Sequence, residues 1–433
     1  MKCSTSTMKA IRQLLIQDFE AQLETEGYPT ANQLEQSLRS ELQTIGQEIF
    51  GELLSRMDEC QNSSQAKCEC GSRAHRTARR PAQLLSVFGW VHYRRANYHC
   101  EQCGRRGYAL DRQQQLRPGR ATQPMAALLG LAGITVSFEE ARHHIREYLQ
   151  VEVGINTIRQ ETQLIGERQR QREREMLDRS QDLNHLQQRK RQPVEAKKRV
   201  YGSIDGVFVP LEQDWKEAKL VSWYQVGVRY GSPEPHAQDI QYHISLEDSA
   251  FFSDLVWATA LEYQADRAQE LVFVCDGAPW IWKLVEHNFP QAVQIVDWYH
   301  ACQYLHPAAE ALYATAEQRA DWLAEMETLL WEGQVERILQ KIRKLPKRVG
   351  APAEQLLSYY SNNRQRMRYA DFRRANYFIG SGTVESGCKQ IVSMRLKRSG
   401  ARWSKSGAVA TAKARAAWLS NDWLAVTQLP LAV

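Results

Sequence analysis

Three acidic residues of this 433-residue chain stand where a carboxylate could hold a metal ion. Asp205 lies inside a strand-forming segment, SIDG, and Asp276 ends a second such segment, VCDGAP. Glu385 lies in the first turn of a predicted helix that follows the sequence GSGT. If these side chains converge, their negative charges repel one another and favour divalent cations with oxygen ligands. Two Mg²⁺ or Mn²⁺ ions held in this way could cleave and rejoin phosphodiester bonds.

Each of these acids also has a purely structural interpretation. Asp205 and Asp276 precede glycine, which is typical of turn-forming aspartate, and Glu385 could complement a helix dipole. A fourth acid, Asp297, lies at the edge of a further predicted strand, AVQIVDWYHA, and precedes His300 by three residues. This pair could support the metal site, orient DNA or replace one of the three acids. We assign it an auxiliary role because its strand is expected to lie farther from that of Asp205.

Four of the nine cysteines form two closely spaced pairs. They are Cys68, Cys70, Cys100 and Cys103. Between the pairs, the segment LLSVFGWVHYRRANYH is rich in β-branched and aromatic residues that partly alternate, which predicts a strand or a β-hairpin. Two cysteine pairs joined by a hairpin are typical of a zinc ribbon, in which four thiolates hold a structural Zn²⁺. Free buried cysteines are the alternative, and His75, His99 or Cys60 could replace one ligand.

The charge of the chain is unevenly distributed, although the formal net charge is only +6. Residues 388–415 contain no acidic residue and eight cationic ones, which are Lys389, Arg395, Lys397, Arg398, Arg402, Lys405, Lys413 and Arg415. Such a segment favours a polyanionic partner, and a solvated basic helix face is the alternative.

Residues 137–167 predict a helix–turn–helix. Ser137 and Glu140 have the spacing of a capping box at the start of one helix, and helical spacing resumes after the turn VEVG. In a DNA-binding motif of this kind the second helix enters the major groove, which would direct Asn156 and Arg159 toward bases or phosphates. An αα-hairpin that does not touch DNA is the alternative.

The segments around the acids predict a mixed α/β domain. From Val200 the pattern predicts three strands, a helix, a strand, a helix and a strand, which is the order of an RNase H-like core. An all-helical insertion follows, and a last helix carries Glu385. The predicted fold class is multidomain α+β: an RNase H-like mixed α/β catalytic core with a helical insertion, preceded by a zinc-ribbon and helix–turn–helix region.

Changes of composition divide the chain into seven predicted segments. These are an N-terminal helical region (1–60), a zinc-ribbon-like segment (61–119), a helix–turn–helix-like DNA-binding segment (120–166), a charged helical linker (167–199), the first part of the core (200–302), the helical insertion (303–372) and the last part of the core with the basic segment (373–433). The content of 43% hydrophobic and 24% charged residues is that of a globular protein. The sequence contains no run of about 18 apolar residues and no N-terminal cleavage signal, so we expect a cytoplasmic protein without a membrane partner.

Several motifs together resemble the DDE transposases of bacterial insertion sequences, most closely the Kra-type group. They are CECG and CEQCG, YGSIDGVFVP, VCDGAPWIW, VDWYHA and GSGTVESGCKQIVSMRLKRSGARWS, and they are spread over most of the chain. The resemblance implies two-metal DNA cleavage and strand transfer, with Asp205, Asp276 and Glu385 as the catalytic, metal-binding triad. The segment from Asp297 to His300 is similar to the Asp-x-x-His element of Mutator-type transposases, which implies an auxiliary role.

The same resemblance implies that the basic segment binds DNA. The residues concerned are Lys389, Arg395, Lys397, Arg398, Arg402 and Trp403. Those near the Glu385 helix would hold phosphates beside the scissile bond, and Arg402 and Trp403 would clamp the strand end. Recognition of terminal inverted repeats would fall to the ribbon and the helix–turn–helix.

These observations lead us to expect a transposase of the bacterial cytoplasm, associated with the nucleoid. Its partners would be double-stranded DNA, as element ends and as target, and further copies of the chain in a homodimer or higher oligomer. The alternatives are a catalytically silent or domesticated DNA-binding regulator and an RNase H-like nuclease without strand transfer.

Overall fold

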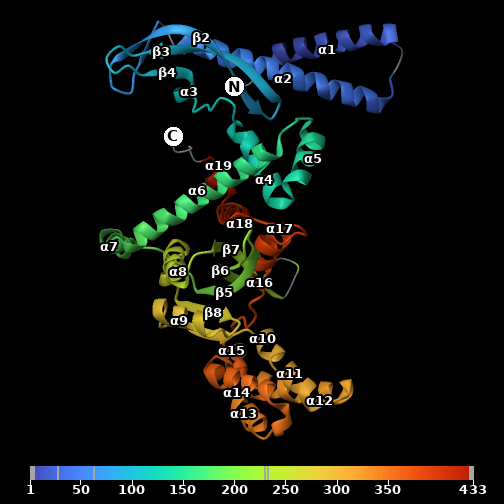
Figure 1. Ribbon diagram of the computed structural model, residues 1–433, viewed down its shortest axis with the longest axis vertical. Coiled ribbons are helices and arrows are strands. Elements are labelled where there is room, and N and C mark those ends of the chain that lie inside the picture. Colours follow the sequence, from blue (N-terminus) through green and yellow to red (C-terminus); the bar gives the residue numbers. More distant parts are fainter. Residues whose placement is uncertain (1–4, 27–28, 62–63, 229–230, 232–233, 429–433) are drawn as a thin grey trace. The chain divides into compact units, whose positions relative to one another are not determined.

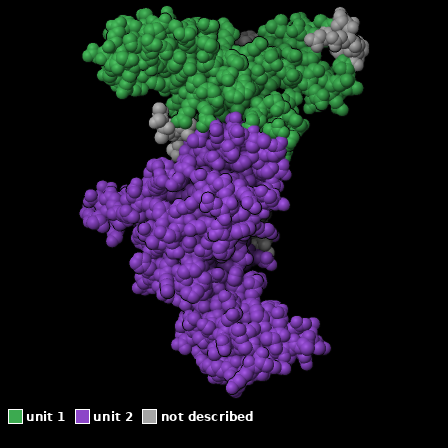
Figure 2. Space-filling model, viewed as in Figure 1, with its two compact units in different colours: residues 1–126, 142–154 green, residues 127–141, 155–433 purple. Residues whose placement is uncertain are grey.

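The structure is a computed structural model that describes residues 5–26, 29–61, 64–228, 231 and 234–428. The chain forms two compact units (Figure 2). Unit 1 comprises residues 1–126 and 142–154, and unit 2 comprises residues 127–141 and 155–433. Mixed helices and two separate sheets make this a multidomain α+β fold.

Unit 1 contains two long helices and a four-stranded antiparallel sheet (Figure 1). Its main elements are α1 (Thr5–Glu26), α2 (Ala31–Gln61), β1 (Gln65–Lys67), β2 (Arg73–Ser86), β3 (Gly89–His99), β4 (Arg106–Tyr108) and α3 (Ala109–Gln113), with the strands in the order β1-β2-β3-β4. The predicted hairpin is confirmed as β2 and β3, with Leu84 opposite Val91. Helix α2 packs tightly on β3 at Gly51, where a Cβ atom would collide with the carbonyl oxygen of His92.

Unit 2 is built around a five-stranded mixed sheet. Its strands are β5 (Arg199–Pro210), β6 (Trp215–Val228), β7 (Pro235–Ser245), β8 (Glu270–Cys275) and β9 (Val293–Val296), in the order β7-β6-β5-β8-β9. The pairs among β5, β6 and β7 are antiparallel, whereas β8 is parallel to both β5 and β9. The predicted order of three strands, a helix, a strand, a helix and a strand is confirmed.

Helices cover both faces of this sheet. On one face, α8 (Ser249–Tyr263) and α9 (Pro279–Asn288) pack on strand residues such as Trp223 and Phe273. On the other face, Leu220 and Tyr242 pack against a continuous helical stretch and a C-terminal helix. The stretch consists of α16 (Gly382–Gly387), a π-helix (Cys388–Ser393) and α17 (Met394–Leu396), and the C-terminal helix is α18 (Lys405–Leu419).

Only helices lie between β9 and α16 in the described chain, as the sequence predicts for an insertion. They are α10 (Trp298–Gln303), α11 (His306–Leu312), α12 (Ala316–Trp331), α13 (Val335–Arg343), α14 (Ala351–Asn363) and α15 (Tyr369–Arg374), with short 3₁₀ turns between some of them. Figure 1 shows α11–α15 grouped on the side of the sheet where β8 lies. The segment WYHA, predicted as part of a strand, instead begins α10, because Asp297 caps that helix.

The segment predicted as a charged helical linker (167–199) is helical as far as Arg191, but its first part, up to Ser180, packs against other elements instead of lying exposed. The preceding helices are α4 (Gln123–Thr135) and α5 (Phe138–Leu149), followed by α6 (Ile155–Gln181), α7 (Leu183–Arg191) and, at the far end of the chain, α19 (Trp423–Gln428). Along α6, Gln169, Glu173 and Met176 are buried. A Cβ atom at Gly166 would collide with the backbone of Ala410, so α6 and α18 cross at close contact. The charged residues of this segment were expected to be exposed because their partners lie far away in the sequence and cannot be recognised from it.

Both predicted helices of the helix–turn–helix are present, and Ser137 and Glu140 form the expected capping box. Helix α5 begins in unit 2 and continues into unit 1, whereas α6 belongs to unit 2. No helix in the described part of the chain has both the length and the apolar character needed to cross a membrane.

Candidate active site and cysteine cluster

Three aspartates lie at one level across adjacent parallel strands of unit 2. Strands β5 and β8 pair Gly202 with Phe273, and β8 and β9 pair Cys275 with Val296. Continuing the first register places Asp205 opposite Asp276, and continuing the second places Asp276 opposite Asp297. Asp276 and Asp297 directly follow the carboxyl ends of β8 and β9, and Asp205 lies on β5 beside them; ligand sites form at such strand ends in open α/β sheets.

Asp205 and Asp276 are each fixed by a hydrogen bond close to them in the chain. The amide of Gly206 donates to Asp205 Oδ1 (2.7 Å), and the amide of Ala278 donates to Asp276 Oδ1 (2.9 Å). Burial raises the pKa of Asp205, and the negative charge of Asp276 raises it further. The Asp276 charge therefore disfavours ionisation of Asp205, which is the electrostatic condition that a bound cation would relieve.

The glycine after Asp276 is required by packing. Gly277 has a φ of +98°, and a Cβ atom there would lie 2.7 Å from the ring of Tyr359. The hydroxyl of Tyr359 donates to the backbone oxygen of Asp276 (2.6 Å), and Asn363 Nδ2 lies 3.4 Å from the Gly277 oxygen. The Asp-Gly pair of VCDGAP thus forms a tight turn that α14 holds in place.

Glu385 is positioned by the GSGT turn. The helix begins at Gly382 with Ser381 as its N-cap. The Ser381 amide donates to Asp297 Oδ2, and the Ser381 hydroxyl lies 3.0 Å from Glu385 Oε1. At Gly387 a Cβ atom would meet the Tyr242 ring at 2.6 Å, so glycine lets this helix approach the sheet closely.

Asp297, His300 and Glu385 form the tightest group of potential ligands in unit 2. One atom from each residue lies within 4.8 Å of the others, and His300 Nδ1 is 3.2 Å from Asp297 Oδ1 and 3.6 Å from Glu385 Oε1. Asp205 and Asp276 are outside this group. The pair assigned an auxiliary role in the sequence therefore lies beside one predicted triad member, Glu385.

The charges of Asp297 and His300 stabilise each other. Burial opposes ionisation of Asp297, but hydrogen bonds from His300 and Ser381 outweigh it and lower the pKa of Asp297. The same contact with Asp297 raises the pKa of His300 despite its partial burial. Asp297 is fully buried and also accepts the His300 amide at 2.8 Å, as a helix N-cap does. The Asp-x-x-His spacing is thus partly a capping signal.

Three tyrosine hydroxyls of the insertion hold the acid-bearing loops, a feature that sequence analysis missed. Besides Tyr359, Tyr360 donates to the Ala301 oxygen (2.9 Å) and Tyr369 to the Val296 oxygen (3.0 Å). Both rings are buried in the core shared by the sheet and the insertion. Nothing local in the sequence marks these tyrosines, because their acceptors lie 59 and 73 residues away.

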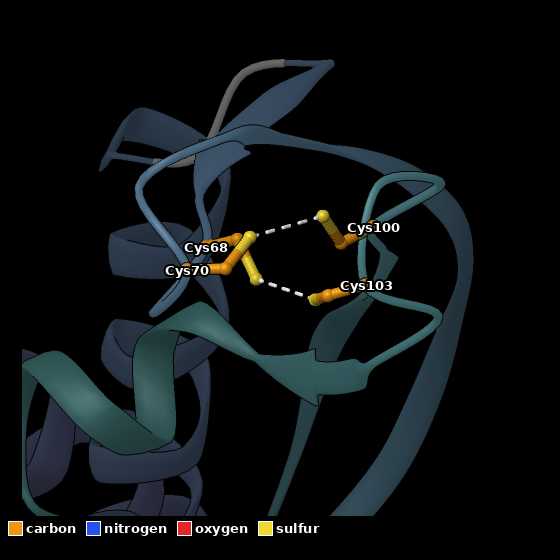
Figure 3. A group of neighbouring side chains, drawn as sticks. All are labelled: Cys68, Cys70, Cys100 and Cys103. Carbon is orange, nitrogen blue, oxygen red and sulfur yellow. Dashed lines mark hydrogen bonds between the residues drawn. The ribbon is translucent and has the colours of Figure 1, made fainter.

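The four predicted cysteines of unit 1 come together in a single cluster (Figure 3). Their sulfur atoms lie within 4.8 Å of one another, with 3.6 Å between Cys68 and Cys103 and between Cys70 and Cys100. A tetrahedral Zn²⁺ with Zn–S bonds of about 2.3 Å would place its sulfurs roughly 3.8 Å apart. The spacing therefore fits one such ion. His75 and His99 do not belong to the cluster, and the side chain of Cys60 lies outside the described residues.

Each cysteine pair lies on a tight turn closed by glycine. The Gly71 amide donates to the Cys68 oxygen (3.0 Å), and the Gly104 amide donates to the Cys100 oxygen (2.8 Å). Both glycines have positive φ, +89° and +69°. Hydrogen bonds from Ser72 lower the pKa of Cys70 to about 6, so this thiolate forms readily. The C-x-C pair and the C-x-x-C pair thus present their sulfurs from the same kind of glycine-closed turn.

Only part of the basic segment, residues 388–415, is exposed. Arg395 and Trp403 are buried, so the prediction that they contact DNA is corrected: Arg395 Nε donates to the Gly133 oxygen (2.7 Å), and Trp403 Nε1 donates to the Leu396 oxygen. Lys413 and Arg415 are buried as well. Their apolar stems and rings fill the space between α18, the sheet and α4, which a count of charges does not reveal.

The remaining predicted DNA contacts are accessible. Lys389, Lys397 and Arg402 are exposed, as are Asn156 and Arg159 in the first turns of α6. Arg398 is partly exposed and forms an ion pair with Glu140.

Over residues 24–427 the chain matches the family described as "Uncharacterised protein family (UPF0236)", and it belongs to that family. No curated protein matches the chain.

Proposed function

We propose that the protein is a DDE-type transposase, which binds the terminal inverted repeats of an insertion sequence and cleaves and transfers DNA strands with divalent cations. The observation that carries this proposal is the charge interaction between Asp205, on β5, and Asp276, which directly follows the adjacent parallel strand β8. The sheet order, with helices on both faces and a helical insertion before Glu385, supports an RNase H-like interpretation of unit 2.

Asp205, Asp276 and Glu385 would hold the Mg²⁺ or Mn²⁺ ions, since carboxylate oxygens are the ligands that these cations prefer. When bound, two such ions activate a water or a 3′-hydroxyl and stabilise the leaving oxygen in phosphodiester displacement. The chain itself orients the ligands: Ser381 connects Glu385 to Asp297, and the Tyr359 hydroxyl fixes the backbone at Asp276.

The other contacts would be structural and electrostatic. A Zn²⁺ ion at the four cysteines would stabilise the β1–β4 sheet, and the sulfur spacing supports this assignment. The exposed cations Lys389, Lys397 and Arg402 would bind phosphates without reading sequence. Asn156 and Arg159, on the exposed start of α6, would contact the terminal repeats.

The test is cleavage of a labelled duplex that carries the element's end, with Mg²⁺ or Mn²⁺, by wild type and Glu385→Gln. We expect the variant to lose cleavage and keep DNA binding. Glu317→Gln is the matched control, because Glu317 also lies in the first turn of a helix and is exposed. Binding without cleavage by wild type would favour a silent regulator, and cleavage without strand transfer would favour a nuclease.

A further inference from the structure

A cavity of about 740 Å³ lies between α9 and α14, immediately beside the Asp276 turn. Gly277 forms part of its wall, together with Trp282, Tyr304, Tyr359 and Asn362. Asp276 itself is not in the wall, so this space is distinct from the edge at which the acids lie. Its size is sufficient for a group as large as a nucleotide.

Two stacked tyrosines form an aromatic wall of the cavity. The rings of Tyr304 and Tyr359 are 3.6 Å apart between centroids and within 7° of parallel. Tyr359 is buried, but Tyr304 keeps 43% of its surface exposed while lining the cavity. A half-exposed ring backed by another ring is a rigid platform for a planar ligand.

The polar groups of the wall favour a ligand that is neutral and has hydrogen-bonding edges. Ser358, Gln355 and Asn362 supply hydroxyl and amide groups. The charged groups balance in number: Lys283 and Arg366 line the cavity together with Glu286 and Glu354, and Arg366 is already paired with Glu286. A free anion such as a polyphosphate would gain little here, whereas a base edge can exchange hydrogen bonds with the amides and the hydroxyl.

Tyr359 links the aromatic wall of the cavity to the candidate active site through direct contacts. The ring of Tyr359 carries Tyr304 on one side, and its hydroxyl holds the Asp276 backbone at 2.6 Å. A base stacked on Tyr304 would therefore belong to a nucleotide close to a phosphate held at the acids.

We propose that this cavity binds an unpaired nucleobase of the DNA strand that the acids cleave. The inference rests on the proposed function and adds a substrate feature to it: the duplex is unpaired next to the scissile phosphate, and the displaced base is held by stacking. Tyr304 is the residue that recognises the base.

The test measures binding of labelled single strands to the full-length, zinc-loaded Glu385→Gln protein. The probes are a thymidine oligonucleotide and a strand of the same length with abasic sites in place of the bases. Because base–aromatic stacking contributes about 1–3 kcal/mol per base, we expect the thymidine strand to bind roughly fivefold or more tightly, and Tyr304→Ala to remove this difference.

Tyr299→Ala is the matched control, because Tyr299 lies on α10, is 69% exposed and does not line the cavity. Tyr304→Phe keeps the ring and should keep the preference for bases, which excludes a folding defect as the cause of the loss. Equal binding of both strands by the parent protein, or an undiminished preference in Tyr304→Ala, overturns the proposal. Competition by thymidine monophosphate as strong as that by the strand would assign the cavity to free nucleotides, and so also overturns it.

The two hypotheses fail separately. If base-dependent binding requires Tyr304 but wild type cleaves no duplex, the proposed function fails and the cavity remains a single-strand site. If cleavage requires Glu385 but binding ignores the bases, only the cavity proposal fails.

Discussion

The cysteine cluster of unit 1 and the acid site of unit 2 both gather potential metal ligands, but they are built in opposite ways. Each half of the cysteine cluster is one short turn closed by a glycine, and one hairpin joins the halves. The acids come from positions 205, 276, 297 and 385, and distant segments bring together the strands and turns that carry them. The helical insertion supplies several of these contacts through tyrosine hydroxyls.

Local turns therefore determine the geometry of the cysteine cluster, whereas tertiary packing determines the geometry of the acid site. In unit 1 the ligands themselves would provide much of the stability, because a bound metal replaces a large core. In unit 2 the core exists without the acids, so the acids can be tuned for chemistry while the packing keeps them in place.

The largest effect should follow from breaking the cysteine cluster. Cys100→Ser removes a buried sulfur, and a structural zinc site contributes about 10 kcal/mol or more to folding. We expect loss of bound zinc and proteolytic sensitivity of the β1–β4 sheet, with unit 2 still folded. Zinc content and limited proteolysis measure this, with buried Cys302→Ser as the control that keeps its zinc. Retention of zinc by Cys100→Ser would contradict a four-thiolate site.

Breaking a buried charge pair should show how much the stability of unit 2 depends on contacts between segments that are distant in the sequence. Glu173 of α6 pairs with Lys413 of α18 and lies 3.2 Å from His243 of β7. Glu173→Gln leaves Lys413 buried without its partner, which costs about 3–5 kcal/mol in the free energy of unfolding. Denaturant unfolding measures the loss, and exposed Glu175→Gln should change little.

The same pair predicts a pH dependence. Burial opposes ionisation of Glu173, but Lys413 and His243 outweigh it and lower the pKa of Glu173 in the folded state. Its contribution to stability is therefore complete above the unfolded pKa of about 4.3 and is lost as the pH falls through the lower folded pKa. Wild type should lose stability in this acidic range more steeply than Glu173→Gln. If the free energies of unfolding of the two proteins change in parallel with pH, Glu173 is not responsible for the loss of stability in acid.

A smaller effect is expected at the Asp276 turn. Gly277→Ala places a Cβ against the Tyr359 ring and adds an unfavourable positive φ, which together cost about 1–3 kcal/mol. The cleavage rate should fall by more than the loss of folded protein explains, because the added Cβ displaces Asp276. Gly400→Ala has a positive φ without any atom within 4 Å of the added Cβ, so it isolates the strain. If Gly277→Ala and Gly400→Ala cleave at equal rates, Tyr359 does not position Asp276.

The smallest change is the loss of one hydroxyl. Tyr360→Phe leaves the buried Ala301 oxygen without this donor, at a cost of about 1–2 kcal/mol. If the insertion positions the site, the metal concentration needed for half-maximal cleavage should rise as well. A purely structural hydroxyl would lower the thermal midpoint and leave that concentration unchanged.

Prediction from the sequence succeeds where the information is local. The cysteine pairs, the hairpin, the capping box of Ser137 and the strand order all follow from spacing and periodicity. It failed where a charged residue has a partner far away in the chain. Arg395 was expected to bind DNA and instead lies over the rings of Phe138 and Trp403, and Glu173, in the segment expected to be a charged linker, instead pairs with Lys413 of α18.

The most direct test of the central claim is Mn²⁺ binding to the zinc-loaded protein, followed by electron paramagnetic resonance. We predict bound Mn²⁺ in wild type and Glu317→Gln, and a large loss of affinity in each of Asp205→Asn, Asp276→Asn and Glu385→Gln. Binding that survives both aspartate changes would contradict the account and would move the metal centre to Asp297, His300 and Glu385.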